Sequence, residues 1–324
     1  MSRSGPPNDP SRGARRRSLV TRVHTDDCGG VLMHRASRLL AVLCGCLVAA
    51  CGVDPSAAPG SSPSAVLPDE QQIRPGVAAA VTEPGGPAEA VVVVLVPGGG
   101  WVSADPSGLA PLAEHLASRG AVVVTLRYRT ATEGAYFPEP ALDIECGIAF
   151  ASTAAGRVLD DRGLGDDPTI AVVGHSAGAQ LSAVAALSPT TLDPGCPYPS
   201  ADADALIGLA GPYDVVAAER QAVNLFGPEY PRLDQWDAGN PIVLASQRPE
   251  LPVLLLHGED DPLVPVAASE TFAQALDEGG HPVELDVLAG VDHDSVYSAE
   301  VAGPVISSWL QLDAPEGQAS PPAR

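Results

Sequence analysis

The sequence contains no lysine and few aromatic residues. All 18 basic residues are arginines, they stand against 40 acidic residues, and aromatic side chains make up 4% of the chain. The acidic excess lies after residue 50, where 10 arginines accompany 37 acidic residues. Such a charge repels nucleic acid and anionic lipid surfaces, so neither is expected as a direct partner. We interpret the acidic residues as a solvated surface.

The apolar run near the N-terminus, residues 39–50, is too short to cross a membrane. Its length is typical of the apolar part of a signal peptide, which predicts a signal peptide within residues 1–50. The small residues directly before Cys51 resemble a bacterial lipobox, in which the peptide is cut and the cysteine is acylated. We therefore expect Met33 to be the true start, residues 1–32 an upstream extension, and a lipid on Cys51 to hold the protein to the membrane outside the cytoplasm. The alternative is an ordinary secretory signal in which Cys51 has no role.

Large apolar residues are scarce from residue 51 to residue 76, where Pro, Ser, Ala and Gly dominate. This composition predicts a flexible tether. A folded domain is expected over residues 77–312 and a disordered tail over residues 313–324.

Cysteine is also sparse in the expected domain, which contains only Cys146 and Cys196. Disulfides persist outside the cytoplasm, so a bridge between these two residues is one possibility. Two unpaired thiols are the other.

Continuous apolar runs in the domain are typical of strands covered on both faces. Helical spacing of apolar residues between them predicts βαβ units, and therefore a parallel sheet with right-handed crossovers. The expected strands are residues 90–96, 121–126, 169–173, 204–210, 252–256 and 283–288, and the expected helical stretches are 108–119, 141–155, 177–187, 271–275 and 301–312. No periodicity is clear over residues 211–250, which we interpret as a lid or cap.

Residues 174–178 read Gly-His-Ser-Ala-Gly and match G-x-S-x-G. They follow an expected strand and precede an expected helix, which is the context of a nucleophile elbow. The two glycines allow a strained turn that exposes the Ser176 hydroxyl, and the helix amides face any negative charge that develops there. A helix-capping serine in a glycine-rich chain is the alternative.

A serine nucleophile needs a base, and the base needs a group that fixes its tautomer. Residues 257–265 read His-Gly-Glu-Asp-Asp-Pro-Leu-Val-Pro and resemble the pattern H-G-x-x-D-x-x-V-P of α/β-hydrolases, which implies Asp261 as the acid and leaves Asp260 as the second choice. The segment Gly290-Val291-Asp292-His293 is similar to the terminal G-x-x-H of the same family and implies His293 as the base. His115, His175, His257 and His281 lack its combination of position and order.

An oxyanion needs two or more N–H donors aimed at one point. Pro97-Gly98-Gly99-Gly100-Trp101 resembles the H-G-G-G loop of esterases and lipases related to hormone-sensitive lipase and feruloyl esterases, although Pro97 replaces the usual histidine. The resemblance implies donors at Gly99 and Gly100, with Ala177 as a third and Gly98 less certain. A phosphate-binding turn is the alternative, but the segment lacks the spacing and the lysine of such a turn.

Together these motifs imply an α/β-hydrolase fold: a mostly parallel, doubly wound sheet of about eight strands with helices on both faces. They imply a serine esterase that needs no cofactor or metal and acts on a small-molecule or glycan-linked ester. Trp101, Tyr128 and Tyr213 are expected to contact the substrate. An amidase, peptidase or formamidase of the same fold, and a tethered protein that binds without cleaving, are the alternatives.

Overall fold

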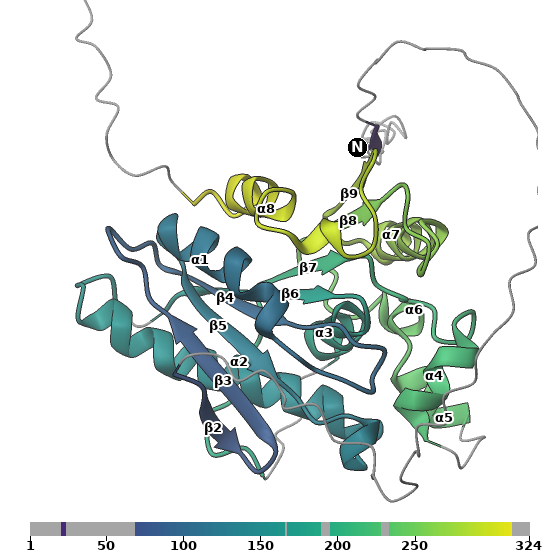
Figure 1. Cartoon of the computed structure of the whole chain (residues 1–324), viewed down its shortest axis with the longest axis horizontal. Helices are drawn as coiled ribbons and strands as arrows, with labels where there is room; N and C mark the ends of the chain where they lie inside the picture. Colours follow the sequence, from purple (N-terminus) through teal and green to yellow (C-terminus); the bar gives the residue numbers. More distant parts are fainter. Residues whose placement is uncertain (1–20, 24–68, 166, 189–194, 228–232, 313–324) are drawn as a thin grey trace, which may run out of the picture.

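The computed structural model of the chain describes residues 21–23, 69–165, 167–188, 195–227 and 233–312 (Figure 1). Its strands are β1 (Thr21–Val23), β2 (Gln71–Arg74), β3 (Val77–Thr82), β4 (Val91–Val96), β5 (Val122–Arg127), β6 (Thr169–His175), β7 (Ala205–Leu209), β8 (Val253–Gly258) and β9 (Val283–Leu288). Its α-helices are α1 (Ala110–Ser118), α2 (Glu139–Asp160), α3 (Ala177–Leu187), α4 (Glu219–Phe226), α5 (Leu233–Ala238), α6 (Pro241–Leu244), α7 (Ala267–Gly279) and α8 (Ala302–Trp309).

The strands form one sheet in the order β1-β9-β8-β7-β6-β4-β5-β3-β2. The pairs from β9 through β5 are parallel, whereas β3 pairs antiparallel with both β5 and β2. The predicted mostly parallel sheet is therefore confirmed, with eight strands over residues 71–288 and the short β1 beside β9. Because β4, β6, β8 and β9 run parallel, the loops that follow them emerge at the same edge of the sheet.

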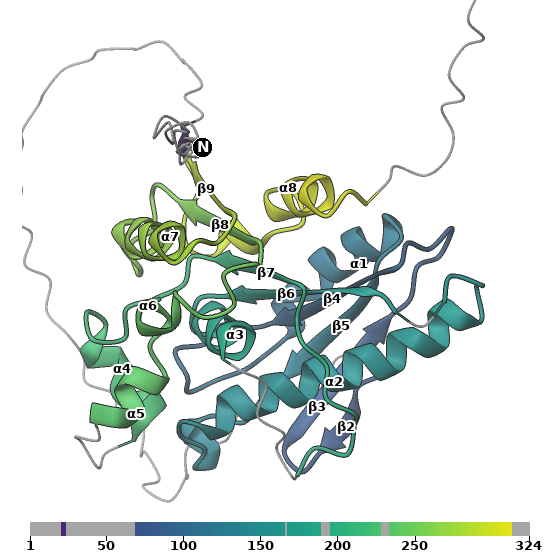
Figure 2. The ribbon, with the colours of Figure 1, turned by 180° about the vertical axis from the view of Figure 1, so that it is seen from behind.

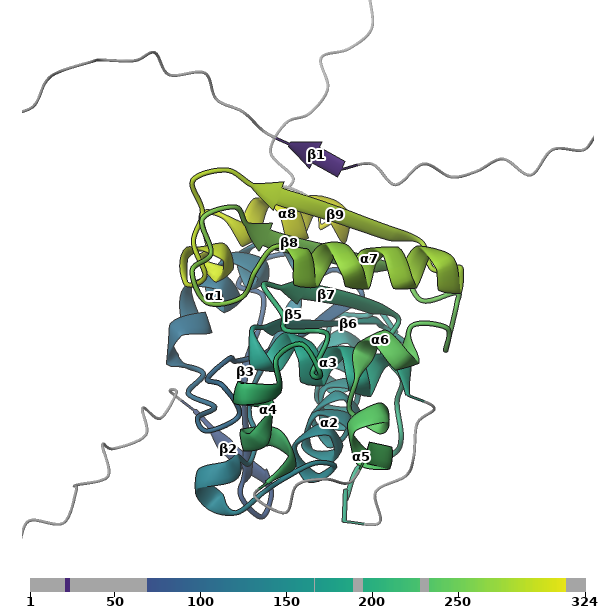
Figure 3. The same cartoon turned by 90° about the vertical axis from the view of Figure 1, so that its right-hand side faces the viewer.

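The alternating side chains of the central strands fill two separate cores. Val92, Val94 and Val96 of β4 belong to the larger core, which includes α2, α3 and α7 side chains. Val93 and Leu95 point to the smaller core, which includes side chains of α1 and α8. Figure 2 shows α2 lying across one face of the sheet, and Figure 3 shows α7 and α8 on opposite sides of β8 and β9. The prediction of helices on both faces is confirmed.

The segment before Val77 departs from the sequence-based prediction. The tether expected over residues 51–76 is wrong at its end, because Gln71–Arg74 form β2. Ile73, the single apolar residue of this strand, is 3% exposed, and Arg74 lies 3.7 Å from the buried Asp143 carboxylate. The buried Ile73 side chain and the Arg74–Asp143 ion pair help to hold this strand beside β3, and neither contact leaves a periodic signal in the sequence.

The segment interpreted as a lid or cap contains α4, α5 and α6. These helices are short, and aromatic rings pack α4 against its surroundings: Phe226 of α4 lies 4.5 Å from Trp236 of α5 and 5.6 Å from Phe137, measured between ring centroids. Helices of eight, six and four residues are too short to show a sustained apolar period, so no pattern over residues 211–250 predicted them.

Cys146 on α2 and Cys196 form a disulfide. The two residues are 50 positions apart, so the bridge ties the segment after α3 to the outer helix. Cys51 and the signal-like residues before it lie outside the described residues, as does the expected tail. Within the described ranges, no helix has both the length and the apolarity that a membrane span requires.

Candidate active site

Ser176 occupies the sharp turn between β6 and α3. Its backbone angles are φ 52° and ψ −122°, a conformation that a non-glycine residue adopts only where the surroundings enforce it. A Cβ atom on Gly174 would lie 2.4 Å from the Gly178 carbonyl oxygen, and one on Gly178 would lie 2.4 Å from the Pro97 carbonyl oxygen. Both flanking positions therefore require glycine, as the elbow motif predicted.

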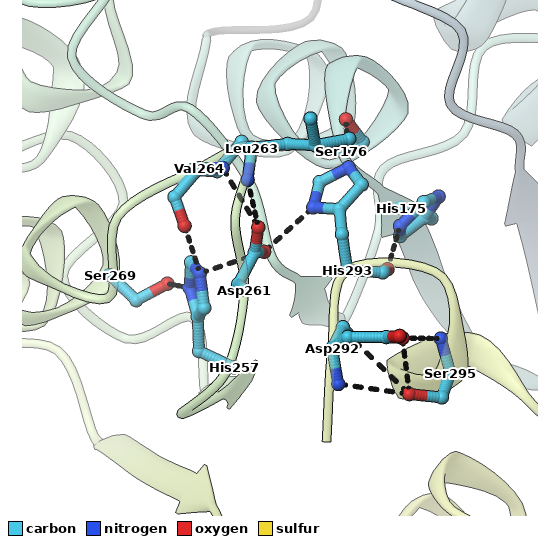
Figure 4. A network of polar contacts seen from close by, with 10 residues as sticks. All are labelled: His175, Ser176, His257, Asp261, Leu263, Val264, Ser269, Asp292, His293 and Ser295. Carbon is cyan, nitrogen blue, oxygen red and sulfur yellow. Dashed lines mark hydrogen bonds and ion pairs between the residues drawn. The ribbon is translucent and has the colours of Figure 1, made fainter. Parts of the chain in front are cut away.

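The three residues predicted from separate motifs meet in one line of hydrogen bonds (Figure 4). His293 Nε2 lies 2.9 Å from Ser176 Oγ, and His293 Nδ1 lies 2.7 Å from Asp261 Oδ2. Since a carboxylate only accepts, Nδ1 carries the ring proton and Nε2 is free to accept from the hydroxyl. This is the tautomer that a general base for Ser176 needs.

Asp261 is held as a carboxylate by four groups. Its Oδ1 accepts the backbone N–H groups of Leu263 and Val264 at 2.8 and 2.9 Å, and its Oδ2 faces two histidine rings. Burial alone would raise the pKa of this carboxyl, but the hydrogen bonds from Val264, His293 and Leu263 outweigh burial and lower the pKa. The alternative acid, Asp260, is exposed, and it is Asp261 that lies against His293.

His257 is a supporting residue to which the sequence assigned no role. Its Nε2 lies 2.9 Å from the Val264 carbonyl oxygen and 3.2 Å from Asp261 Oδ2, while its Nδ1 lies 2.7 Å from Ser269 Oγ. Two acceptors at Nε2 place the proton there, so Ser269 donates to Nδ1. Burial lowers the pKa of His257, which keeps the ring neutral. Asp261 is thus fixed between two histidines, and no local spacing links Ser269 to the site.

His175 supports the base from the other side. Its Nε2 donates to the His293 carbonyl oxygen at 2.9 Å, and its ring centroid lies 4.8 Å from that of His293 and 4.4 Å from that of Tyr297. Burial, with His293 as a second cause, lowers the pKa of His175 to about 4. The neutral ring therefore holds the backbone of His293 without adding a positive charge beside it.

The glycine loop after β4 adopts three consecutive positive φ angles, 131° at Gly99, 59° at Gly100 and 61° at Trp101. The Gly99 carbonyl accepts the N–H groups of Val102 and Ser103, both at 3.1 Å. In a trans peptide the carbonyl and the following N–H point in opposite directions, so this turn directs the Gly100 N–H away from residues 102–103.

The loop is adjacent to the nucleophile. A Cβ atom on Gly98 would lie 3.0 Å from Ser176 Cβ. Among the described residues, no acceptor takes the N–H groups of Gly99, Gly100 or Ala177. Free amides in the loop and at the first residue of α3 are what an oxyanion hole requires.

Pro97 stands where related esterases have a histidine, and Tyr128 stabilises it. The buried Tyr128 hydroxyl donates to the Pro97 carbonyl oxygen at 3.2 Å. Burial also raises the pKa of Tyr128, so the hydroxyl remains a donor.

The predicted substrate contacts of Trp101, Tyr128 and Tyr213 are wrong for this structure. Their side chains are 2%, 1% and 0% exposed. Trp101 Nε1 donates to Gln180 at 2.9 Å, and Tyr213 stacks on Phe272 at 4.3 Å. Trp101 and Tyr128 therefore hold the glycine loop from the buried side, whereas Tyr213 packs on Phe272 in the core.

The other candidate groups lie elsewhere. His115 contacts Ser307 of α8, and His281 Nδ1 bonds the Leu251 carbonyl oxygen. In the part of the chain that the structure describes, no group of three His, Cys, Asp or Glu side chains is arranged to hold a metal ion.

The sheet order, the helix layers and the loop that carries each motif define an α/β-hydrolase fold. Residues 82–276, more than half of the chain, match the BD-FAE family, and the chain belongs to this family. The match includes Ser176 and Asp261 but ends before His293, so the place of His293 beside Ser176 is known from the geometry described above.

Two relatives show the extent of the similarity. Esterase LipQ of Mycobacterium tuberculosis is 30% identical over 234 residues, which are 67% of this chain and 53% of that protein. The probable isoprenylcysteine alpha-carbonyl methylesterase ICME of Oryza sativa is 28% identical over 229 residues, 64% of this chain and 52% of that protein. The chain therefore spans about half the length of these relatives.

A solved structure has the same fold. The acetyl ester-xyloside bifunctional hydrolase from Caldicellulosiruptor lactoaceticus superposes with a TM-score of 0.58 at 21% identity, covering 72% of this chain and 86% of that one. The native structure of Thermogutta terrifontis esterase 2 superposes with a TM-score of 0.56 at 20% identity, covering 75% of this chain and 90% of that one.

The low pKa of His175 predicts a pH-dependent stability. An unfolded histidine titrates near pH 6.5, whereas folded His175 titrates near 4. As the pH falls through this window the unfolded state takes up the proton first, so the folded state loses about 2–3 kcal/mol between pH 7.5 and 4.5. Urea unfolding should show a smaller loss over this range in His175→Gln, whose amide can still donate to the His293 carbonyl. An equal pH dependence of the free energy of unfolding in the native protein and in His175→Gln would contradict the lowered pKa of His175.

Proposed function

We propose that this protein is a serine hydrolase that cleaves carboxylic esters through an acyl-enzyme on Ser176. The observation that carries the proposal is the line Asp261–His293–Ser176, with contacts of 2.7 and 2.9 Å, at a strained elbow beside unpaired amides. Relatives named esterase and probable carboxylic ester hydrolase support the same reaction class. The substrate class follows as a small-molecule ester.

The geometry accounts for each step of such a reaction. Ser176 Oγ attacks the ester carbonyl carbon while His293 Nε2 takes the hydroxyl proton. The amides of Gly99, Gly100 and Ala177 stabilise the oxyanion, and its collapse expels the alcohol, which receives the proton from His293. Water then attacks the acyl-enzyme with His293 as base again, and the acid leaves as Ser176 recovers its proton.

Replacement of the nucleophile tests the proposal. Ser176→Ala should lower kcat for p-nitrophenyl acetate by roughly 10⁴-fold or more, because no other group can form the acyl-enzyme. Ser182→Ala, which removes a buried hydroxyl further along α3, serves as the control and should change kcat only a few-fold. Full activity in Ser176→Ala would rule out the mechanism.

The choice between neighbouring acids gives a second test. Asp261→Asn places an amide beside His293 Nδ1, which favours the wrong ring tautomer and should lower kcat about 10⁴-fold. Asp260→Asn makes the same change at an exposed side chain and should leave kcat nearly unchanged. The reverse order of effects would assign the acid to Asp260.

We also propose that the protein is held outside the cytoplasm by a lipid on Cys51. The apolar run over residues 39–50, the small residues before Cys51, and a disulfide between Cys146 and Cys196 support this location. In a bacterial host that processes lipoproteins, the native protein should fractionate with membranes and Cys51→Ser should not. A native protein found only in the cytoplasmic fraction would contradict the proposal.

A further inference from the structure

Helix α4 contacts the glycine loop directly. Asn224 Nδ2 donates a hydrogen bond to the Gly100 carbonyl oxygen at 3.2 Å, across 124 positions of sequence. Asn224 is half-buried, while Gln221 on the same helix is exposed. The contact thus joins the short-helix segment, which contains α4, α5 and α6, to a peptide of the oxyanion loop, residues 97–101.

This bond holds a loop carbonyl to which no backbone N–H of the described residues donates. Among three successive carbonyls, Gly99 O accepts from Val102 and Ser103, and Trp101 O accepts from Ala131 N at 2.9 Å. Gly100 O is bonded by the Asn224 side chain instead. Glycine rotates freely about both backbone torsions, so the peptide between Gly100 and Trp101 depends on this contact for its orientation.

That peptide carries the Trp101 N–H and adjoins Gly100, so its orientation affects where the neighbouring loop amides lie. Holding the carbonyls on both sides of Gly100 sets its φ and ψ together. The Gly100 N–H belongs to the peptide that the bonds to the Gly99 carbonyl orient. Rotation of the next peptide would turn the Trp101 N–H and displace the Gly100 Cα, and so change the position of the Gly100 N–H relative to Ser176 Oγ. Removal of a single oxyanion-hole donor costs about 10²–10³ in kcat, and a misaligned donor loses part of that contribution.

Helix α4 is anchored well enough to act as a support. Ala222 and Leu225 are fully buried, and the Leu225 carbonyl accepts the Phe137 N–H at 2.7 Å. The stacked pair of Phe226 and Trp236 extends this packing to α5.

A second, parallel connection runs through Gln180 of α3. This fully buried amide accepts from Trp101 Nε1 and donates to the Gly239 carbonyl oxygen at 2.7 Å. The loop is therefore connected to this segment at Gly100 directly and at Trp101 through Gln180.

We propose that Asn224 is a positioning residue for the oxyanion loop, so that the loop has its working conformation only while α4 is docked. The inference rests on the proposed esterase function. It assigns to α4 a role in transition-state stabilisation through Gly100, without any contact between Asn224 and the substrate.

The test compares Asn224→Asp with Gln221→Glu in the full-length protein. Asp keeps the shape of Asn but presents an oxygen to the Gly100 carbonyl, while Gln221→Glu adds the same charge to an exposed position of α4. For p-nitrophenyl acetate, Asn224→Asp should lower kcat about 10–100-fold with KM changed less than about threefold. Binding of a trifluoromethyl ketone, which mimics the tetrahedral intermediate, should weaken by the same factor as kcat/KM.

Hydrogen exchange supplies a readout that does not depend on catalysis. Amide exchange in a peptide spanning residues 97–103 should be faster in Asn224→Asp than in the native protein and in Gln221→Glu. Unchanged exchange there, or kcat within twofold of the native value, would overturn the proposal. If the native protein cleaves no ester, the esterase function fails, and the exchange result still decides whether Asn224 orders the loop.

Discussion

The strained turn at Ser176 is the constraint on which the site depends. A φ of 52° at a serine costs on the order of 1–3 kcal/mol, and contacts of the surrounding backbone must offset this cost. Gly174 and Gly178 make this possible because each lies against backbone atoms where a Cβ would collide, and the carbonyl that Gly178 contacts belongs to Pro97. The nucleophile and the oxyanion loop are therefore packed backbone against backbone, and the position of one sets the position of the other.

The buried charge of Asp261 is satisfied on both sides. The Asp261 Oδ1 atom accepts two backbone N–H groups, and both His257 and His293 contact the Oδ2 atom. An unpaired carboxylate in such a setting would take up a proton, and the base would lose its fixed tautomer. The neutral His257 supplies a donor without adding a charge, and His175 does the same for the backbone of His293. Of the three buried histidines, His293 contacts both Ser176 and Asp261, while His257 and His175 hold Asp261 and the His293 backbone.

The strands and the motif residues could be predicted from the sequence because each is specified by a local pattern of residues. The strands β4, β6, β7 and β8 are short, largely apolar runs between turns, and the motifs around Ser176 and Asp261 follow strands whose carboxyl ends share one edge. The support of the site is different, because contacts between distant segments leave no periodic signal. Asn224 bonds Gly100 across 124 positions, and Ser269 reaches Asp261 only through His257. The burial of Trp101, predicted to contact substrate, follows from packing that the sequence does not display.

The central claim is that Ser176 is a nucleophile activated by His293. The most direct measurement is mass spectrometry of the native protein after reaction with a fluorophosphonate probe, with the labelled peptide sequenced. The account predicts one adduct per chain, located on Ser176 and suppressed by heat denaturation before labelling. An adduct on another residue, or none on a folded protein, would contradict it.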